Sequence, residues 1–149
     1  METLTGTIFD QLGPRPKMAE LVDWKLLALD KSARHIRIGY TAQKLFANPL
    51  GFAHGGFIVA MLDETMGATV IGVTDAEYFS TTISMSVDFL RPVPLGSLIA
   101  EGRITKLGKQ IVFLESVLTD EAGKKFARAT ASYKLIAFDI SAIQNNMQM

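Results

Sequence analysis

HGGFIVAMLDETMGATVIGV, residues 54–73, is the segment from which the fold of this chain is most readily inferred. From residue 57 to residue 70 apolar side chains fall on nearly every face of a helix, and a helix that is apolar all round is buried on all sides. A glycine pair precedes this run, and two adjacent carboxyl groups interrupt it near its middle. We therefore expect one long central helix.

The segments on both sides of this helix have the patterns of strands. Apolar and polar residues alternate along residues 82–89, which is the two-residue period of a half-buried strand. Further strand-like runs lie at residues 24–29, 34–40, 97–105, 110–119 and 126–138. Most of the connections between these runs are short, and short connections join antiparallel neighbours. The expected fold is α+β, a long antiparallel sheet wrapped around a central buried helix.

The length of 149 residues favours a single domain, which we place at residues 17–138. It would begin with one or two helical turns at residues 17–23. Residues 1–16, which contain two glycines and two prolines, are expected to form a loosely structured lead-in. The polar C-terminal tail, residues 139–149, is expected to be disordered.

The composition excludes several classes of function. Fifteen Lys and Arg balance fifteen Asp and Glu, so the basic excess of a nucleic-acid-binding protein is missing. Without cysteine there are no disulfides, thiolate metal sites or cysteine nucleophiles, and with two histidines we expect no metal and no cofactor. No signal peptide and no uninterrupted membrane-spanning stretch is predicted, so we expect a cytoplasmic protein that does not bind membranes.

The loop before the helix, from Asn48 to the glycine pair Gly55-Gly56, carries the candidate chemistry. Most glycine pairs are flexible turns, but this pair opens a helix, where the first N–H groups lack partners and the dipole is positive. Such donors can bind an oxygen that gains negative charge, as acyl transfer requires. His54 could act as a general base, although we favour a supporting role in which its ring holds the loop. Asn48 could brace the same loop.

Asp63 is the second candidate. A lone carboxylate on a helix is usually a surface charge, but the apolar neighbours of Asp63 predict a buried helix, where an unpaired carboxylate is costly. Buried carboxylates beside a pocket are candidate bases or nucleophiles. Glu64 lies about 100° further round the helix, and we interpret it as a structural partner.

The spacing of these candidates predicts how the site is assembled. Asp63 follows Gly55 by eight residues, which is about 12 Å along a helix at 1.5 Å per residue. A base or nucleophile must come within about 3 Å of its target, or reach it through one water. One chain cannot easily offer both groups to one carbonyl, whereas two chains related by a two-fold axis can. We therefore expect the active site to lie across a dimer interface.

The segment from Asn48 to Asp63 resembles the hotdog-fold thioesterases of the PaaI type. Their hallmark is a Gly-x-x-His-Gly-Gly loop followed by a helix that carries Asp or Glu nine residues after the histidine. This chain has these residues at the same spacing, namely Gly51, His54, Gly55, Gly56 and Asp63. The resemblance extends from about Ala19 to Leu135.

This resemblance implies hydrolysis of an acyl-coenzyme A thioester to a free acid and coenzyme A. The Gly55 N–H would polarise the thioester carbonyl, and Asp63 of the other subunit would act as base or nucleophile. Asn48 and His54 would support the loop and the leaving sulfur. Thr82, with Thr81 as the alternative, would help to hold the water.

The resemblance also implies contacts with the substrate and a mode of assembly. Gly56 and Phe89 would bind the substrate, with Phe52 and Phe57 making the pocket mouth apolar. Lys106 and Arg91 would meet coenzyme A phosphates, although both would otherwise be ordinary strand-end cations. The chain would form a homodimer and, through it, a homotetramer.

Two alternatives remain open at this stage. One is a dehydratase on the same fold, for which His35 is the only other histidine. The other is a non-catalytic hotdog domain that binds an acyl group or coenzyme A, because a fold does not fix a function. The second alternative would be favoured if a structural cation occupied Asp63. The acyl group stays undetermined.

Overall fold

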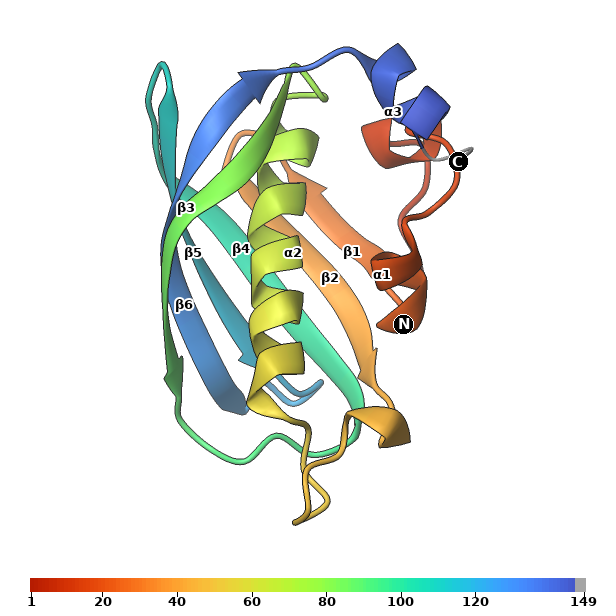
Figure 1. Cartoon of the computed structure of the whole chain (residues 1–149), viewed down its shortest axis with the longest axis vertical. Coiled ribbons are helices and arrows are strands. Elements are labelled where there is room, and N and C mark those ends of the chain that lie inside the picture. Colours follow the sequence, from red (N-terminus) through yellow and green to blue (C-terminus); the bar gives the residue numbers. More distant parts are fainter. Residues whose placement is uncertain (147–149) are drawn as a thin grey trace.

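A computed structural model describes residues 1–146 of the chain (Figure 1). Its elements, in chain order, are η1 (Ile8–Gln11), α1 (Lys17–Leu21), β1 (Lys25–Asp30), β2 (His35–Ala42), η2 (Lys44–Phe46), α2 (Gly55–Val73), β3 (Tyr78–Phe89), β4 (Gly96–Leu107), β5 (Ile111–Thr119), β6 (Lys125–Ala137) and α3 (Ile140–Asn146). All six predicted strands and the long helix are therefore present.

The strands form one antiparallel sheet in the order β1-β2-β4-β5-β6-β3. Figure 1 shows this sheet curving around α2, and the helix contacts every strand. The predicted α+β fold, a long antiparallel sheet wrapped around a central helix, is confirmed. In this order β1 and β3 are the edge strands, and the edge at β3 is the one that matters for the site.

The core lies between α2 and the concave face of the sheet. The alternation predicted for β2 is confirmed, since Ile36, Ile38 and Tyr40 are all buried. The helix lies close against β4 at Gly102, where any side chain would collide with Thr69. Glycine at this position therefore sets how closely the helix and sheet approach each other.

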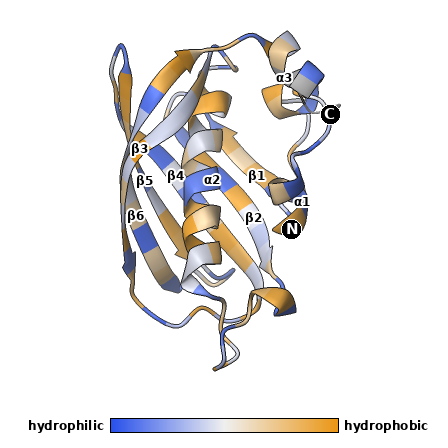
Figure 2. Ribbon diagram, in the orientation of Figure 1, coloured by the Kyte–Doolittle hydropathy of each residue, from blue (hydrophilic) through white to orange (hydrophobic). Residues whose placement is uncertain are grey.

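One side of α2 differs from the expectation that the whole helix is buried. Glu64, Gly67 and Ile71 are only half-buried, because the sheet covers the opposite side of the helix. Figure 2 shows α2 as mostly hydrophobic, with one hydrophilic turn near its middle. By length and composition α2 could also cross a membrane, and 56% of its most apolar window is buried inside the protein, as in a globular core helix.

The lead-in at residues 1–16 is more ordered than expected. Gly13 turns the chain with φ 90°, and η1 brings the ring of Phe9 to 5.3 Å from that of Trp24. The N–H of Leu4 donates to the carbonyl of Leu26 at 2.7 Å. The order comes from Phe9, which is half-buried against Trp24 and reaches α2 at Gly72.

The C-terminal tail also differs from its prediction. Residues 140–146 form the short helix α3 rather than a disordered segment, and Phe138 just before it stacks on Phe79 with ring centroids 5.9 Å apart. The remainder of the predicted disordered tail, residues 147–149, lies outside the described residues.

Candidate active site

The loop that precedes α2 is braced by Asn48. Its carboxamide oxygen accepts hydrogen bonds from the N–H groups of Leu50 at 2.9 Å and Phe52 at 3.1 Å. The turn between them needs Gly51, whose φ of 83° lies in the left-handed region that favours glycine. The oxygen of Asn48 is therefore committed to the shape of the loop, and only its amide nitrogen remains to contact a substrate.

His54 caps the first turn of α2. The Nδ1 of its ring accepts a hydrogen bond from the backbone N–H of Gly56 at 3.2 Å, and the backbone N–H of His54 donates to the carbonyl of Phe46 at 2.7 Å. This contact occupies Nδ1 in holding the first turn of the helix, which fits a supporting role. Because Gly56 donates to this ring, the N–H of Gly55 is the donor left without a partner among residues 1–146 at this helix start.

Phe89, at the end of β3, forms the wall beside this donor. Its ring lies next to Gly55, where an added Cβ would be 3.4 Å from the ring carbons. The Phe89 side chain is 52% exposed, so it borders an open space rather than the core. Phe57, expected at the pocket mouth, stacks on the buried Phe46 with ring centroids 4.0 Å apart and is itself only partly buried.

Asp63 lies midway along α2 and is half-buried. Its Oδ1 accepts hydrogen bonds from the hydroxyls of Thr82 at 2.7 Å and Tyr133 at 2.6 Å. Thr82 and Tyr133 are directly paired across β3 and β6, so both reach the same carboxyl group. Thr81, the alternative to Thr82, points to the opposite face of the strand.

Tyr133 is the residue that sequence reasoning missed. Its side chain is almost completely buried, and a buried tyrosine hydroxyl needs a hydrogen-bond partner. Burial, and then the hydrogen bond to the Asp63 carboxylate, raise the pKa of Tyr133, so the hydroxyl remains a donor. In the sequence Tyr133 follows small alanines on the buried face of β6, which indicates that it is buried but does not link it to Asp63.

Glu64 does not behave as the structural partner that we expected. Within residues 1–146 no hydrogen bond or ion pair joins its carboxyl group to another side chain. Burial, and then the adjacent charge of Asp63, raise the pKa of Glu64 above its ordinary value. The structure therefore places two carboxyl groups side by side, and only Asp63 is held by donors.

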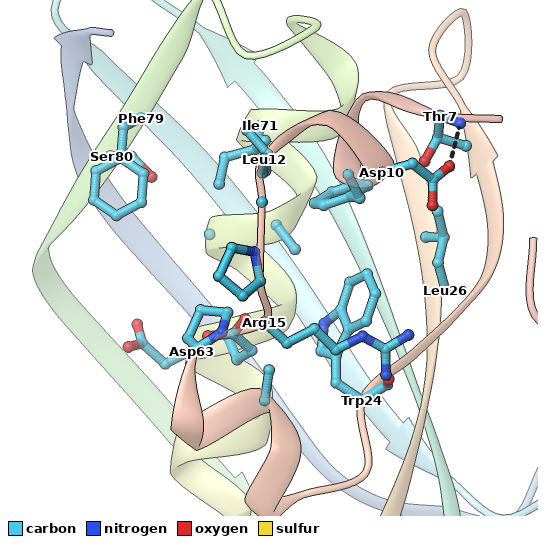
Figure 3. A pocket seen from close by; sticks show the side chains of 18 of the residues that line it. Thr7, Asp10, Leu12, Arg15, Trp24, Leu26, Asp63, Ile71, Phe79 and Ser80 are labelled. Atoms are coloured by element: carbon cyan, nitrogen blue, oxygen red, sulfur yellow. Dashed lines mark hydrogen bonds between the residues drawn. The ribbon is translucent and has the colours of Figure 1, made fainter. Parts of the chain in front are cut away.

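A cavity of about 310 Å³ lies against Asp63 (Figure 3). Asp63, Thr82 and Tyr133 form one side of it, and the lead-in forms the other. Gly55 does not line this cavity, because it begins the same helix eight residues earlier, about 12 Å away. Each chain thus carries two separate groups, a backbone donor at one end of α2 and a carboxylate in the middle.

With this geometry established, comparison with protein families identifies the chain. The thioesterase superfamily matches residues 50–127, a range that contains both Gly55 and Asp63. The chain belongs to the thioesterase superfamily. This thioesterase is accordingly a thioester hydrolase with the hotdog fold.

Two proteins resemble this thioesterase in sequence. One is a Saccharolobus solfataricus protein whose name provisionally describes it as an esterase. It is 28% identical over 123 residues, which cover 83% of this chain and 86% of the Saccharolobus protein. The acyl-coenzyme A thioesterase THEM4 of Xenopus laevis is 35% identical over 66 residues, which cover 44% of this chain and 28% of the frog protein.

Solved structures share the fold of this thioesterase. A phenylacetic acid degradation-related protein of Ralstonia eutropha has a TM-score of 0.80 and 27% identity, covering 87% of this chain and 99% of its own. The PaaI protein of E. coli has a TM-score of 0.74 and 18% identity over 83% of this chain and 86% of its own. A Streptococcus mutans protein bound to acetyl CoA has a TM-score of 0.69 and 22% identity, and the match covers 76% of this chain and 89% of the Streptococcus chain. The last two show the fold alone.

The predicted phosphate-binding cations of the thioesterase do not converge on Asp63 within one chain. Arg91 donates from Nη1 to the carbonyl of Lys125 at 2.7 Å, which ties it to the start of β6. Lys106 lies on β4, and two strands separate it from Thr82 on β3, a distance of about 14 Å at 4.8 Å per strand. Any role of these residues in binding coenzyme A remains a prediction.

The remaining polar groups do not suggest a different chemistry at this site. His35, the other histidine, lies on the sheet with its Nε2 3.1 Å from the carboxylate of Glu101 and does not line the Asp63 cavity. In the described part of the chain no three His, Asp or Glu side chains lie close enough together to hold a metal ion. Among residues 1–146, Asp63 is held by hydroxyl groups and not by a cationic side chain.

Proposed function

We propose that this thioesterase hydrolyses acyl-coenzyme A to a free acid and coenzyme A at a site shared between two subunits. The observation that carries the proposal is the layout of α2, with an unpartnered N–H at Gly55 and a hydroxyl-held carboxylate at Asp63. The acyl-coenzyme A thioesterase named among the relatives and the acetyl CoA bound to one structural neighbour support this substrate class.

The Gly55 N–H acts on the thioester carbonyl. Attack on that carbonyl converts it into a tetrahedral intermediate whose oxygen is negatively charged. A fixed donor at the positive end of a helix stabilises this charge more than it stabilises the neutral carbonyl. His54 and Asn48 act indirectly, since their side-chain hydrogen bonds hold the loop and the first helical turn.

Asp63 of the partner subunit supplies the attack. The hydroxyls of Thr82 and Tyr133 hold Oδ1, which leaves Oδ2 to face the substrate. As a base, Asp63 takes a proton from water, the water oxygen bonds to the acyl carbon, and the carbon–sulfur bond breaks as coenzyme A leaves and takes a proton. As a nucleophile, Asp63 bonds to the acyl carbon, the carbon–sulfur bond breaks and coenzyme A leaves with a proton, and water then cleaves the resulting anhydride to the free acid and the Asp63 carboxylate. Both routes need the same two half-sites.

The β3 edge supports a homodimer. In the described part of the chain the outer backbone groups of β3 have no strand beside them, and an unpaired edge of 12 residues is a template for pairing with another chain. Ile83 and Phe89 on this strand are 56% and 52% exposed, so pairing there would also cover apolar surface. A two-fold axis at this edge would bring Gly55 of one protomer toward Asp63 of the other, and such dimers would pair into tetramers.

The first test measures hydrolysis of a panel of acyl-coenzyme A esters with a thiol-detecting dye. Asp63→Asn should lower kcat by orders of magnitude while KM stays within a few-fold. A variant that keeps full activity would show that Asp63 is not the base or nucleophile. A wild-type protein that cleaves nothing on the panel would support the non-catalytic alternative.

The second test asks whether the site is shared. In our proposal the variants Asp63→Asn and Gly55→Pro are each inactive. A mixed dimer of the two has one intact site, in which Gly55 of the first protomer meets Asp63 of the second. Co-expression with two affinity tags isolates this mixed dimer, which should recover about half of the wild-type activity. Mixed dimers as inactive as their parents would place both groups in one chain.

A further inference from the structure

The cavity beside Asp63 extends along α2. Asp63, Gly67 and Ile71 all line it, and their spacing of four residues places them in one row on the surface of the helix. The eight residues from the first to the last of them span about 12 Å of helix. Figure 3 shows Asp63 at one end of this row and Ile71, with Leu12 of the lead-in, at the other. The cavity therefore leads away from the carboxyl group that we propose as base or nucleophile.

Gly67 is the member of this row that the chain itself does not explain. Glycine in the interior of a helix destabilises it relative to alanine, because glycine loses more conformational freedom on folding. Beyond the backbone of α2 and the two adjacent residues, an added Cβ at Gly67 would meet no atom within 4 Å among residues 1–146. Gly67 is half-buried, and it lines the cavity. The glycine thus provides empty space one helical turn from Asp63.

Gly72, the other glycine beyond the first turn of α2, differs in this respect. An added Cβ there would lie 2.9 Å from Cδ1 of Leu29 and 3.1 Å from Cε2 of Phe9, so packing within the chain explains why no side chain is present. The two glycines of the first turn also have a side chain within 4 Å of the added Cβ. Among the glycines of α2, Gly67 alone leaves a space that residues 1–146 do not fill.

The walls of the cavity suit a hydrocarbon chain. Its apolar lining includes Leu12, Pro14 and Ile71. Arg15 also lines the cavity, but its Nη1 donates to the carbonyl of Trp24, and in Figure 3 both residues lie across α2 from the carboxyl group that begins the row. A volume of about 310 Å³ lies at the lower end of small-molecule sites, which span about 300–1,000 Å³. The cavity can hold an acyl chain but not a whole coenzyme A ester.

We propose that the acyl chain of the substrate lies along α2 in this cavity and that Gly67 is a specificity-determining residue, because its missing side chain leaves room for the chain to pass. The inference rests on the proposed function. One helical turn, about 6 Å, separates Asp63 from Gly67. A butanoyl chain ends near Gly67, whereas an octanoyl chain passes it toward Ile71 and buries more apolar surface. The preferred substrates are therefore coenzyme A esters of unbranched acyl chains of medium length.

The kinetic test compares octanoyl-coenzyme A with butanoyl-coenzyme A, and its measure is the ratio of the two kcat/KM values. The wild type should favour the octanoyl ester by about tenfold. Gly67→Ala should lower this ratio by about tenfold and Gly67→Leu by about a hundredfold, the range expected when a group is added to the wall of an apolar pocket. Equal kcat/KM values in the wild type, or an unchanged ratio in Gly67→Leu, would overturn the inference and leave the proposed function intact.

Val73→Ile is the matched control. It adds one carbon atom to the same helix, as Gly67→Ala does, but at a residue that does not line the cavity. The ratio of the two kcat/KM values in Val73→Ile should match that of the wild type. A fall as large as that in Gly67→Ala would overturn the assignment of Gly67, because any added carbon on α2 would then have the same effect.

The stability of Gly67→Ala distinguishes an open cavity from a contact between subunits. If the space at Gly67 is open in the assembled protein, the new methyl group meets nothing and alanine favours the helix, so Tm should rise by about 2–4 °C. The oligomeric state, measured by light scattering, should match that of the wild type. A lower Tm together with dissociation of the subunits would show that the partner subunit fills the space, and would overturn the inference.

A binding measurement separates the inference from the proposed function. In the Asp63→Asn protein, isothermal titration should show octanoyl-coenzyme A binding about tenfold more tightly than butanoyl-coenzyme A. Adding Gly67→Leu to this protein should abolish the difference. That result would support the inference even if the wild type hydrolysed neither ester. Tighter binding of the octanoyl ester that survives Gly67→Leu would overturn the inference even if the wild type hydrolysed both.

Discussion

The two ends of the proposed chemistry on α2 are built in different ways. At Gly55 the functional group is a backbone N–H, and the residues that hold it, Asn48 and His54, lie within seven positions of it in the sequence. At Asp63 the functional group is a side chain, and the donors that hold it come from Thr82 and Tyr133. The donor end thus depends on a local loop, and the acid end depends on how the sheet packs against the helix.

The largest expected effect is at the donor end. Gly55→Pro removes the N–H at the first position of α2, where proline is well tolerated, and His54 already has the extended conformation that precedes proline. We expect kcat to fall by about 10²–10³, the cost of losing one oxyanion donor. Gly55→Ala keeps the N–H and should retain much more activity. If both variants lost the same activity, the side chain and not the N–H would be responsible.

At the acid end we expect a smaller effect from Tyr133→Phe. The change removes one of two donors to Oδ1 and leaves Thr82 in place, so kcat should fall by about tenfold with little change in KM. Tyr40→Phe is the matched control, because its buried hydroxyl pairs with Thr65 in the core at 2.9 Å. The control should lower the melting temperature but spare kcat. Equal loss of kcat in both would indicate a general packing defect.

The same contrast explains how much could be predicted from the sequence. The helix, the strands and the spacing of Gly55 and Asp63 follow from local periodicity, which a single sequence displays. Tyr133 was missed because its role depends on the pairing of β3 with β6, which no local pattern specifies. The lead-in was misjudged for a similar reason, since its order comes from packing on Trp24 and α2.

Asn48 allows the bracing of the loop to be separated from contact with substrate. Asn48→Ala removes both hydrogen bonds to the loop, and we expect the free energy of unfolding to fall by about 1–2 kcal/mol. For a chain of this size that corresponds to about 2–8 °C in Tm. Asn48→Asp keeps the oxygen and should keep Tm, which thermal unfolding would check. A variant with normal Tm and low kcat would show that the amide nitrogen contacts the substrate.

The smallest effect is expected from Glu64, which has no counterpart at the donor end. Its raised pKa means that the folded state holds the Glu64 proton more tightly than the unfolded chain does. The folded state therefore loses stability as pH rises above the unfolded value near 4.5. Glu64→Gln cannot ionise, so its Tm should match the wild type at pH 4 and exceed it at pH 8.

The exposed Glu115 provides the control for this pH dependence, since Glu115→Gln changes the net charge equally without altering a buried group. The Tm of Glu115→Gln should follow that of the wild type from pH 4 to pH 8. A Glu64→Gln protein that is less stable than the wild type at pH 8 would mean that the charged form of Glu64 is stabilised in the assembled protein. In that case a cation from the partner subunit would face Glu64, and the acid end of the site, unlike the donor end with its local loop, would depend on a neighbouring group that one chain does not display.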